Sequence, residues 1–320
     1  MIDDGESGRY SAESIRGFAL SVPDQLHESL SLQLAPVGRK GRVCMFGVGN
    51  SATAGQVMKV YLDSVAKENV PMICGGEVPG WIGPNDCAIL ISYSGESHDI
   101  LEAYDRLRSI GTEIFCIVGG GRLRENAERD GVFIMELPRD IPSRAVFGYT
   151  LGYLSLLIQA LGVVDVADCL SECLDDVRKY VDSASSSDYL DDKAALFIDR
   201  IPAVYTTSDL LPVARRMRDD LYQNCGMISF YGELPEYDHN EIVGWAYPNA
   251  HAPNLSMFVL RGKDETPLMD VIIDSMIKTL GEFGRDVTVF DVPGDNVLVS
   301  NILGCVTADL VSARIKEMMG

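Results

Sequence analysis

Short runs of apolar residues alternate with segments of helical spacing along the first half of the chain. The apolar runs, each bounded by Gly, Asn or Asp, are residues 42–47, 87–92, 113–118 and 132–136. Continuous runs of this length are typical of strands that are buried on both faces of a parallel sheet. The helical spacing and capping residues lie between them, at 51–67, 97–110 and 123–130. This alternation predicts a doubly wound α/β sheet.

The second half of the chain repeats this architecture. A helical stretch at 146–180 is followed by a polar segment of small residues at 182–188, where we place a domain boundary. Beyond it, strands are expected at residues 202–207, 227–231, 255–260 and 286–291, and helices near 209–224, 267–282 and 297–318. The 320 residues suffice for two domains, because single hydrophobic cores stop growing near roughly 250–300 residues.

The charge of the chain narrows the choice of partners. Asp and Glu number 47 against 27 Lys and Arg, which gives a formal net charge of −20. Such a field repels nucleic acid and anionic membrane surfaces, so we expect neither as a partner. A small phosphorylated ligand stays possible, because backbone amides can capture it locally.

Targeting and metal signals are missing from the sequence. No apolar run approaches the roughly 18 residues of a membrane helix, and the acidic start is unlike a secretion signal, so we expect a cytoplasmic protein. None of the eight cysteines forms a Cys-x-x-Cys pair, so a zinc site or a disulfide scaffold is not indicated. We expect no metal and no cofactor.

The segment from Gly47 to Gly55 is the first candidate for a binding site. It follows an expected strand and opens an expected helix, so its glycines permit a tight turn and free N–H groups point outward to an anion. A dinucleotide fits less well, because Ala52 stands where the fingerprint has its third glycine. No Gly-Lys-Ser/Thr follows either, so this is not a Walker loop.

A second loop offers three hydroxyls around a glycine. Ser92, Ser94 and Ser97 lie between an apolar strand and a helix, and hydroxyls with N-terminal amides make a neutral phosphate pocket. The plainer interpretation is that Ser97 only caps the helix and Ser92 only ends the strand. Both loops follow strands at their carboxyl ends, where open α/β sheets bind ligands, which favours a binding function.

These residues carry a family resemblance. Gly47-Val-Gly-Asn-Ser51 and Ser92-Tyr-Ser-Gly-Glu-Ser97 resemble the two loops of the sugar isomerase (SIS) domain, Gly-x-Gly-x-Ser and Ser-x-Ser-Gly-x-Thr. Residues 239–245, His-Asn-Glu-Ile-Val-Gly-Trp, resemble the signature of the archaeal-type bifunctional phosphoglucose/phosphomannose isomerases, as does Pro-Ser-Arg-Ala at 142–145. The resemblance implies a sugar-phosphate site made of Gly49, Ser51, Ser92, Ser94 and Ser97.

The resemblance also implies a fold and a reaction. The fold would be two SIS-type domains, residues 1–181 with leading helices and residues 182–320, each a parallel five-stranded sheet flanked by helices. The reaction would interconvert glucose 6-phosphate or mannose 6-phosphate with fructose 6-phosphate through an enediol. His239 would assist ring opening, reaching the site of the neighbouring subunit in a homodimer, and Arg144 would stabilise the enediolate. A surface ion pair is the plainer interpretation of Arg144.

The chain departs from the family at two catalytic positions. Gln223 falls where relatives have the proton-shuttling Glu, and a neutral amide cannot take a proton from carbon. The resemblance also implies an active-site Lys in a tail after the last helix; Lys316 lies within the expected helix, and a solvated charge at the helix end is its favoured interpretation. Two hypotheses follow. The chain is an isomerase with another base, such as Glu233, Glu236 or Asp238, or it is a phosphosugar-binding or regulatory protein without isomerase activity.

Overall fold

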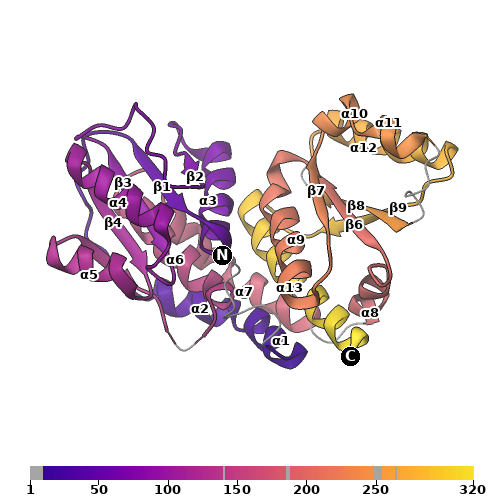
Figure 1. Cartoon of the computed structure of the whole chain (residues 1–320), viewed down its shortest axis with the longest axis horizontal. Helices are drawn as coiled ribbons and strands as arrows, with labels where there is room; N and C mark the ends of the chain where they lie inside the picture. The colour runs from indigo at the N-terminus through magenta and orange to yellow at the C-terminus, as the bar shows by residue number, and fades with distance from the viewer. Residues whose placement is uncertain (1–9, 140, 185–187, 248–253, 264) are drawn as a thin grey trace. The chain divides into compact units, whose positions relative to one another are not determined.

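The computed structural model describes residues 10–139, 141–184, 188–247, 254–263 and 265–320, and it divides into two compact units (Figure 1). The N-terminal unit comprises residues 21–176. The C-terminal unit comprises residues 177–320 together with the first helix, α1 (Ala12–Leu20). The division falls within helix α7 (Val166–Ala184), which also contains the expected boundary at residues 181 and 182.

The N-terminal unit is built around a parallel five-stranded sheet in the order β2-β1-β3-β4-β5. Its strands are β1 (Val43–Gly47), β2 (Met72–Ile73), β3 (Cys87–Ser92), β4 (Glu113–Val118) and β5 (Phe133–Glu136). The four strands expected from apolar runs are confirmed, and only the two-residue β2 was missed. The strand order reverses direction between β1 and β3, which makes this pair the switch point where doubly wound sheets bind ligands.

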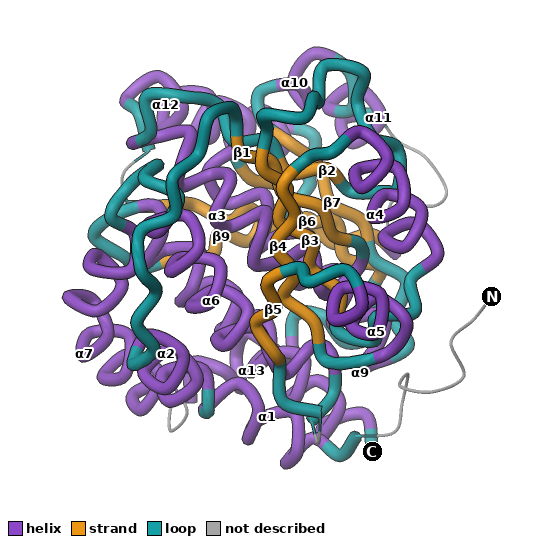
Figure 2. The backbone as a smooth tube through the Cα atoms, turned by 90° about the vertical axis from the view of Figure 1, so that its left-hand side faces the viewer, coloured by secondary structure: helices purple, strands orange, loops and turns teal. Residues whose placement is uncertain are grey.

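Helices cover this sheet (Figure 2). They are α2 (Val22–Leu30), α3 (Ala52–Val65), α4 (His98–Ile110), α5 (Gly121–Arg129) and α6 (Phe147–Ala160). Every residue of β1 and β3 is buried, which is why these strands are apolar without alternation. On one face, Phe46 and Leu90 pack with Tyr104 of α4 in a single apolar cluster. Buried Cys116 belongs to the same cluster, and burial raises the pKa of its thiol to about 12, so it behaves as a core residue.

The C-terminal unit contains a second parallel sheet in the order β7-β6-β8-β9. Its strands are β6 (Ile201–Thr206), β7 (Phe230–Glu233), β8 (Leu255–Gly262) and β9 (Val287–Val292). The resemblance implied five strands here, and the described residues form four. The helices are α8 (Asp188–Ala195), α9 (Leu211–Cys225), α10 (Glu236–His239), α11 (Ile242–Ala246), α12 (Pro267–Glu282) and α13 (Val297–Met319).

Helix α13 is the central helix of the C-terminal unit. By length and composition alone it could cross a membrane, but 89% of its most apolar window is buried within the protein, as in a core helix. It packs against α9, and the buried Arg216 of α9 makes a bidentate ion pair with Asp309 of α13 at 2.8 and 2.9 Å. Asp220 lies 3.8 Å from the same guanidinium group. This buried pair fixes the register of α9 on α13.

We predict that Asp309→Ala lowers the free energy of unfolding by about 3–5 kcal/mol, because it leaves the buried Arg216 guanidinium with less compensation. Asp191→Ala is the matched control, since Asp191 pairs with Arg314 at the exposed surface and its loss should cost under about 1 kcal/mol. Urea unfolding of both variants measures the difference. Equal losses would show that the buried pair does not stabilise the unit.

Candidate functional site

The two loops predicted from the sequence meet at the carboxyl ends of β1 and β3. Gly47 pairs in register with Ile91, so the chain leaves both strands at the same edge of the sheet. After β1 it forms a 3₁₀ turn, Gly49–Ser51, in which Gly49 has a φ of 56°. The N–H group of Tyr93 donates to the hydroxyl of Ser51 at 3.2 Å, which ties the loop after β3 to this turn.

The three serines of the second loop differ in their surroundings. Ser92 is buried, and its hydroxyl accepts the N–H of Gly95 at 3.2 Å, so it shapes the loop. Ser94 is exposed, with its hydroxyl accepting the N–H of Glu96 at 3.2 Å. Ser97 occupies the N-cap position of α4, yet its side chain makes no capping hydrogen bond. The side-chain hydrogen bond of a helix cap is therefore not formed, and the Ser97 hydroxyl lies beside the first N–H groups of α4, which have no partner within the helix.

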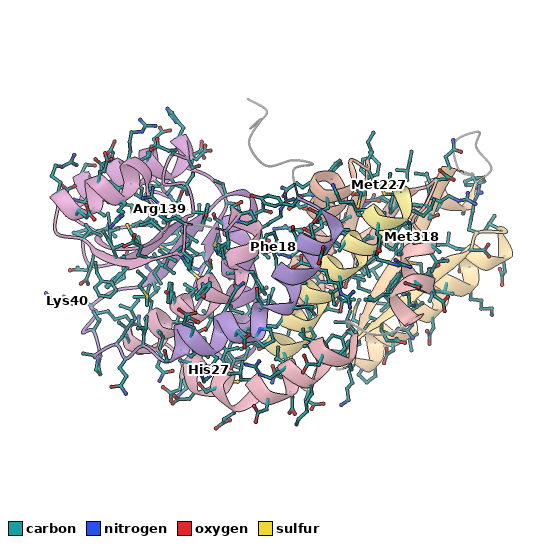
Figure 3. All side chains as sticks on the ribbon, turned by 90° about the horizontal axis from the view of Figure 1, so that it is seen from below. Phe18, His27, Lys40, Arg139, Met227 and Met318 are labelled. Carbon is teal, nitrogen blue, oxygen red and sulfur yellow. The ribbon has the colours of Figure 1, made fainter. Side chains whose placement is uncertain are left out.

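A third loop, residues 119–121 after β4, was missed in the sequence analysis. It packs against the loop of residues 92–97, which we call the serine loop. Gly119 donates its N–H to the carbonyl of Tyr93 at 3.0 Å. Gly95 has a φ of 66°, and a Cβ there would lie 1.7 Å from the carbonyl oxygen of Gly120. The guanidinium of Arg139, labelled in Figure 3, lies so close to Gly120 that a Cβ there would be 2.2 Å away. Three consecutive glycines after an apolar strand were the signal available in the sequence.

Glu96 links the serine loop to helix α5. Its carboxylate accepts the backbone N–H of Arg122 at 2.9 Å and the Nε–H of the same residue at 2.7 Å. The Arg122 hydrogen bonds hold the pKa of Glu96 below its usual range. This carboxylate is thus engaged at the N-terminus of α5, where negative charge is favourable.

Arg144 is placed beside the first loop. It lies on a short 3₁₀ helix, Ser143–Val146, which contacts the Gly49–Ser51 turn. The residue is only 5% exposed, so the alternative of a surface ion pair is wrong. The structure therefore brings Arg144 to the same edge of the sheet as Gly49, Ser51 and the serine loop.

His239 and Gln223 lie in the C-terminal unit, near opposite ends of strand β7. His239 is exposed at the end of α10, which follows the carboxyl end of β7. Gln223 is half-buried in the last turn of α9, and α9 returns the chain to the amino end of β7. Within this unit the two side chains are not brought together. The ammonium of Lys316 donates to the carbonyl of Asn224 at 3.0 Å, so it contacts the end of the helix that carries Gln223.

The motif around His239 is held by hydrogen bonds to a buried tyrosine. The hydroxyl of Tyr205 donates to Glu241 at 2.7 Å and accepts the indole N–H of Trp245 at 3.2 Å. Asp238 is half-buried, and burial raises the pKa of its carboxyl group. Glu241 and Trp245 therefore serve as scaffold, and Asp238 is the neighbouring carboxylate whose proton affinity is increased.

In the second sheet, the position that corresponds to the loops of residues 47–55 and 92–97 is at the carboxyl ends of β6 and β8, and a carboxylate lies there. Glu265 accepts the hydroxyl of Thr207 at 2.9 Å and the N–H of Gly262 at 3.4 Å, and burial raises its pKa.

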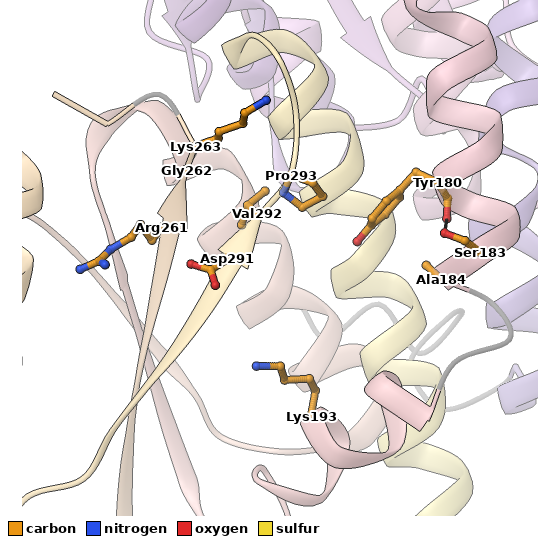
Figure 4. Close-up of a pocket in the computed structure, with 10 residues that line it drawn as sticks. All are labelled: Tyr180, Ser183, Ala184, Lys193, Arg261, Gly262, Lys263, Asp291, Val292 and Pro293. Carbon is orange, nitrogen blue, oxygen red and sulfur yellow. Dashed lines mark hydrogen bonds between the residues drawn. The ribbon is translucent and has the colours of Figure 1, made fainter.

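A cavity of about 730 Å³ lies nearby, where β8 and β9 end (Figure 4). Its walls include Tyr180, Ser183, Lys193, Asp291 and Pro293. None of the sequence-predicted site residues lines it. Among the described residues no cluster of three or more His, Cys, Asp or Glu suits a metal ion.

Two family models match the chain. Residues 38–147 match the SIS domain, and residues 192–320 match the bacterial phospho-glucose isomerase C-terminal SIS domain. The first match contains Arg144 and the two loops of residues 47–55 and 92–97, which we call the cradle. The second match contains Gln223 and His239. Together they cover the sheets of both units.

Curated relatives match much of the chain. A bifunctional phosphoglucose/phosphomannose isomerase from Caldicellulosiruptor bescii is 29% identical over 65% of this chain and 63% of its own length, so the match spans less than two thirds of that protein. The enzyme of the same name from Aquifex aeolicus is 25% identical over 92% of this chain and 88% of its own. A D-glucosamine-6-phosphate 4-epimerase from Sulfolobus acidocaldarius is 28% identical over 67% of each.

Solved structures agree in fold. The C-terminal domain of glucosamine-fructose-6-phosphate aminotransferase from Francisella tularensis superimposes with a TM-score of 0.74 at 14% identity, covering 97% of this chain and 96% of that one. Glucosamine-6-phosphate deaminase from Thermotoga maritima gives 0.70 at 16% identity, covering 96% and 94%. At these identities the likeness concerns the fold alone.

We predict that Gly95→Ala disrupts the cradle, because the new Cβ meets the Gly120 carbonyl at 1.7 Å in addition to the strain of a positive φ. Gly131→Ala is the matched control, since Gly131 has the same φ of 66° with no atom within 4 Å of the new Cβ, and it should cost only the strain of the positive φ, about 1–2 kcal/mol. Thermal unfolding with and without glucose 6-phosphate measures both effects. A ligand-induced stabilisation retained in Gly95→Ala would contradict the arrangement of these loops as a binding site.

Proposed function

This chain belongs to the SIS-domain family with a C-terminal domain of the bacterial phospho-glucose isomerase type, and we propose that it is a phosphosugar isomerase acting on glucose 6-phosphate or mannose 6-phosphate and fructose 6-phosphate. The observation that carries the proposal is the joined pair of loops at the β1/β3 switch point. The relatives named phosphoglucose/phosphomannose isomerase support the choice of substrate.

The phosphate group would be held by hydroxyls and amides. Ser51, Ser94 and Ser97 supply hydroxyls around the N-termini of α3 and α4, and Ser92 holds the loop in shape. Helix N-termini favour an anion through their free N–H groups and the helix dipole. This attraction acts at short range, within the first turn of each helix, whereas the net charge of −20 is spread over the whole protein and its repulsion is screened by salt. The acidic surface therefore does not prevent binding.

The catalytic roles are assigned from position. Arg144, beside the Gly49–Ser51 turn, would stabilise the enediolate oxygen with its fixed charge. His239 would assist ring opening, reaching the cradle of the neighbouring subunit in a homodimer. Gln223 can only hydrogen bond, so the proton shuttle falls to a carboxylate of the segment that carries His239. Of Glu233, Glu236 and Asp238, we favour Asp238, because its raised pKa makes it the better base once ionised.

We propose a cytoplasmic enzyme without nucleic-acid or membrane partners, in keeping with a charged metabolite as substrate.

A second candidate for the reaction is epimerisation of a phosphosugar at another carbon. In keeping with it, the family resemblance aligns Gln223 with the Glu that would move a proton between C1 and C2, and one relative is named D-glucosamine-6-phosphate 4-epimerase. Both activities would use the same cradle.

Replacing Ser94 by Ala should weaken binding of fructose 6-phosphate about tenfold, because one hydroxyl contact to a charged phosphate contributes roughly 1.5 kcal/mol. Ser109→Ala, an exposed serine at the far end of α4, is the matched control and should bind as the wild type does. Isothermal titration calorimetry gives both affinities. Equal affinities in the two variants would remove the support for a phosphate site at these loops.

Asp238→Asn should lower kcat about a hundredfold or more, because an amide cannot act as the base, whereas Gln223→Ala should lower it less than tenfold. Because the Asp238 pKa is raised and the base works ionised, kcat/KM should fall as the pH drops through that raised pKa. Coupled assays of fructose 6-phosphate conversion measure both. A wild-type chain that binds the sugar phosphate without converting it, and gains nothing from Gln223→Glu, would leave only a binding or regulatory role.

A further inference from the structure

A buried glutamine from helix α2 lies against the segment that carries Arg144. Gln25 is 3% exposed and is separated from that segment by about 120 residues of chain. Its amide N–H donates to the carbonyl of Ala145 at 2.7 Å, and Ala145 directly follows Arg144. The contact lies within the N-terminal unit, at the edge of the sheet that holds the cradle.

The other side of the same amide caps helix α6. Its carbonyl oxygen accepts the N–H groups of Gly148 at 3.0 Å and Tyr149 at 3.4 Å, which belong to the first turn of α6. The first N–H groups of a helix have no partner within the helix, and the N-cap residue here is Val146, whose side chain cannot accept a hydrogen bond. Gln25 therefore supplies the cap that the local sequence lacks.

All hydrogen-bonding capacity of the Gln25 amide is in use. The second N–H donates to the hydroxyl of Ser21 at 2.8 Å, which fixes the orientation of the amide group. The approach is close, because a Cβ on Gly148 would lie 2.7 Å from the Cβ of Gln25. A buried amide with every donor and acceptor engaged is held in one orientation. It therefore also fixes the position of the backbone groups to which it is hydrogen-bonded.

We propose that Gln25 is a positioning residue, which sets the backbone that directly follows Arg144, from Ala145 to the first turn of α6, and so holds the guanidinium group beside the phosphate cradle. The inference rests on the proposed function for Arg144, which acts on the reacting sugar. Gln25 itself acts only through the peptide of Ala145 and the start of α6. Substrate affinity resides in the serine loops, so loss of Gln25 should alter turnover more than binding.

The test compares Gln25→Met with Ser29→Ala. Methionine keeps the length of glutamine without its hydrogen bonds, and Ser29 lies one turn further along α2, packed against Gly152 of the same helix α6. We expect Gln25→Met to lower kcat at least tenfold with KM for fructose 6-phosphate within twofold, and Ser29→Ala to keep the wild-type kcat. In an Arg144→Lys background, Gln25→Met should cause no further loss of kcat. A Gln25→Met enzyme with wild-type kcat would overturn the proposal.

A second measurement does not depend on turnover. Phenylglyoxal modifies accessible guanidinium groups, and Arg144 is 5% exposed, so it should react slowly in the wild type. Gln25→Met should raise the modification rate of the Arg144 peptide at least fivefold by mass spectrometry, with Ser29→Ala unchanged. If the wild type proves inactive, the proposed function fails and this rate decides the inference by itself. Equal modification rates in all three proteins would refute the positioning role.

Discussion

The parallel pairing of β1 with β3 is the constraint on which the site depends. Both strands are buried along their whole length, and the pairing Gly47 to Ile91 sets their carboxyl ends side by side. The strand order reverses between β1 and β3, so the connections that follow these two strands run in opposite directions. Neither connection covers the loop after the other strand, which leaves a crevice between the two loops. If the register of β1 against β3 shifted by one residue, each buried side chain of the shifted strand would face the other side of the sheet. The packing of these buried side chains therefore fixes the register of the strands, and with it the position of the two loops.

Glycines and backbone amides make up much of the proposed phosphate site, in which charged residues are few. The loops after β1, β3 and β4 approach so closely that Gly95 has no room for a side chain. The nearby carboxylate of Glu96 is held by Arg122, so it does not lie free beside an anion. A strongly acidic chain can thus present a neutral, hydroxyl-rich site, because hydrogen-bond donors act at short range.

The two units use the same architecture for different purposes. In the N-terminal unit the switch-point edge presents serines, and in the C-terminal unit the corresponding edge contains Glu265 bonded to Thr207. The C-terminal unit devotes its buried polar contacts to joining α9 and α13 through Arg216 and Asp309. That junction orients the helix that carries Gln223.

From the sequence we could predict every parallel strand of the first sheet except β2, the order of helices and strands, and the two glycine-serine loops, because continuous apolar runs and glycine-serine turns are local signals. The three glycines at 119–121 indicated a turn but not which loop it supports, and the burial of Arg144 and the role of Gln25 had no signal at all. Those features depend on contacts between segments up to about 120 residues apart, for which no local pattern exists. Only the tertiary structure could reveal that the helix-start cap of α6 comes from α2, because Val146 gives no sign of it.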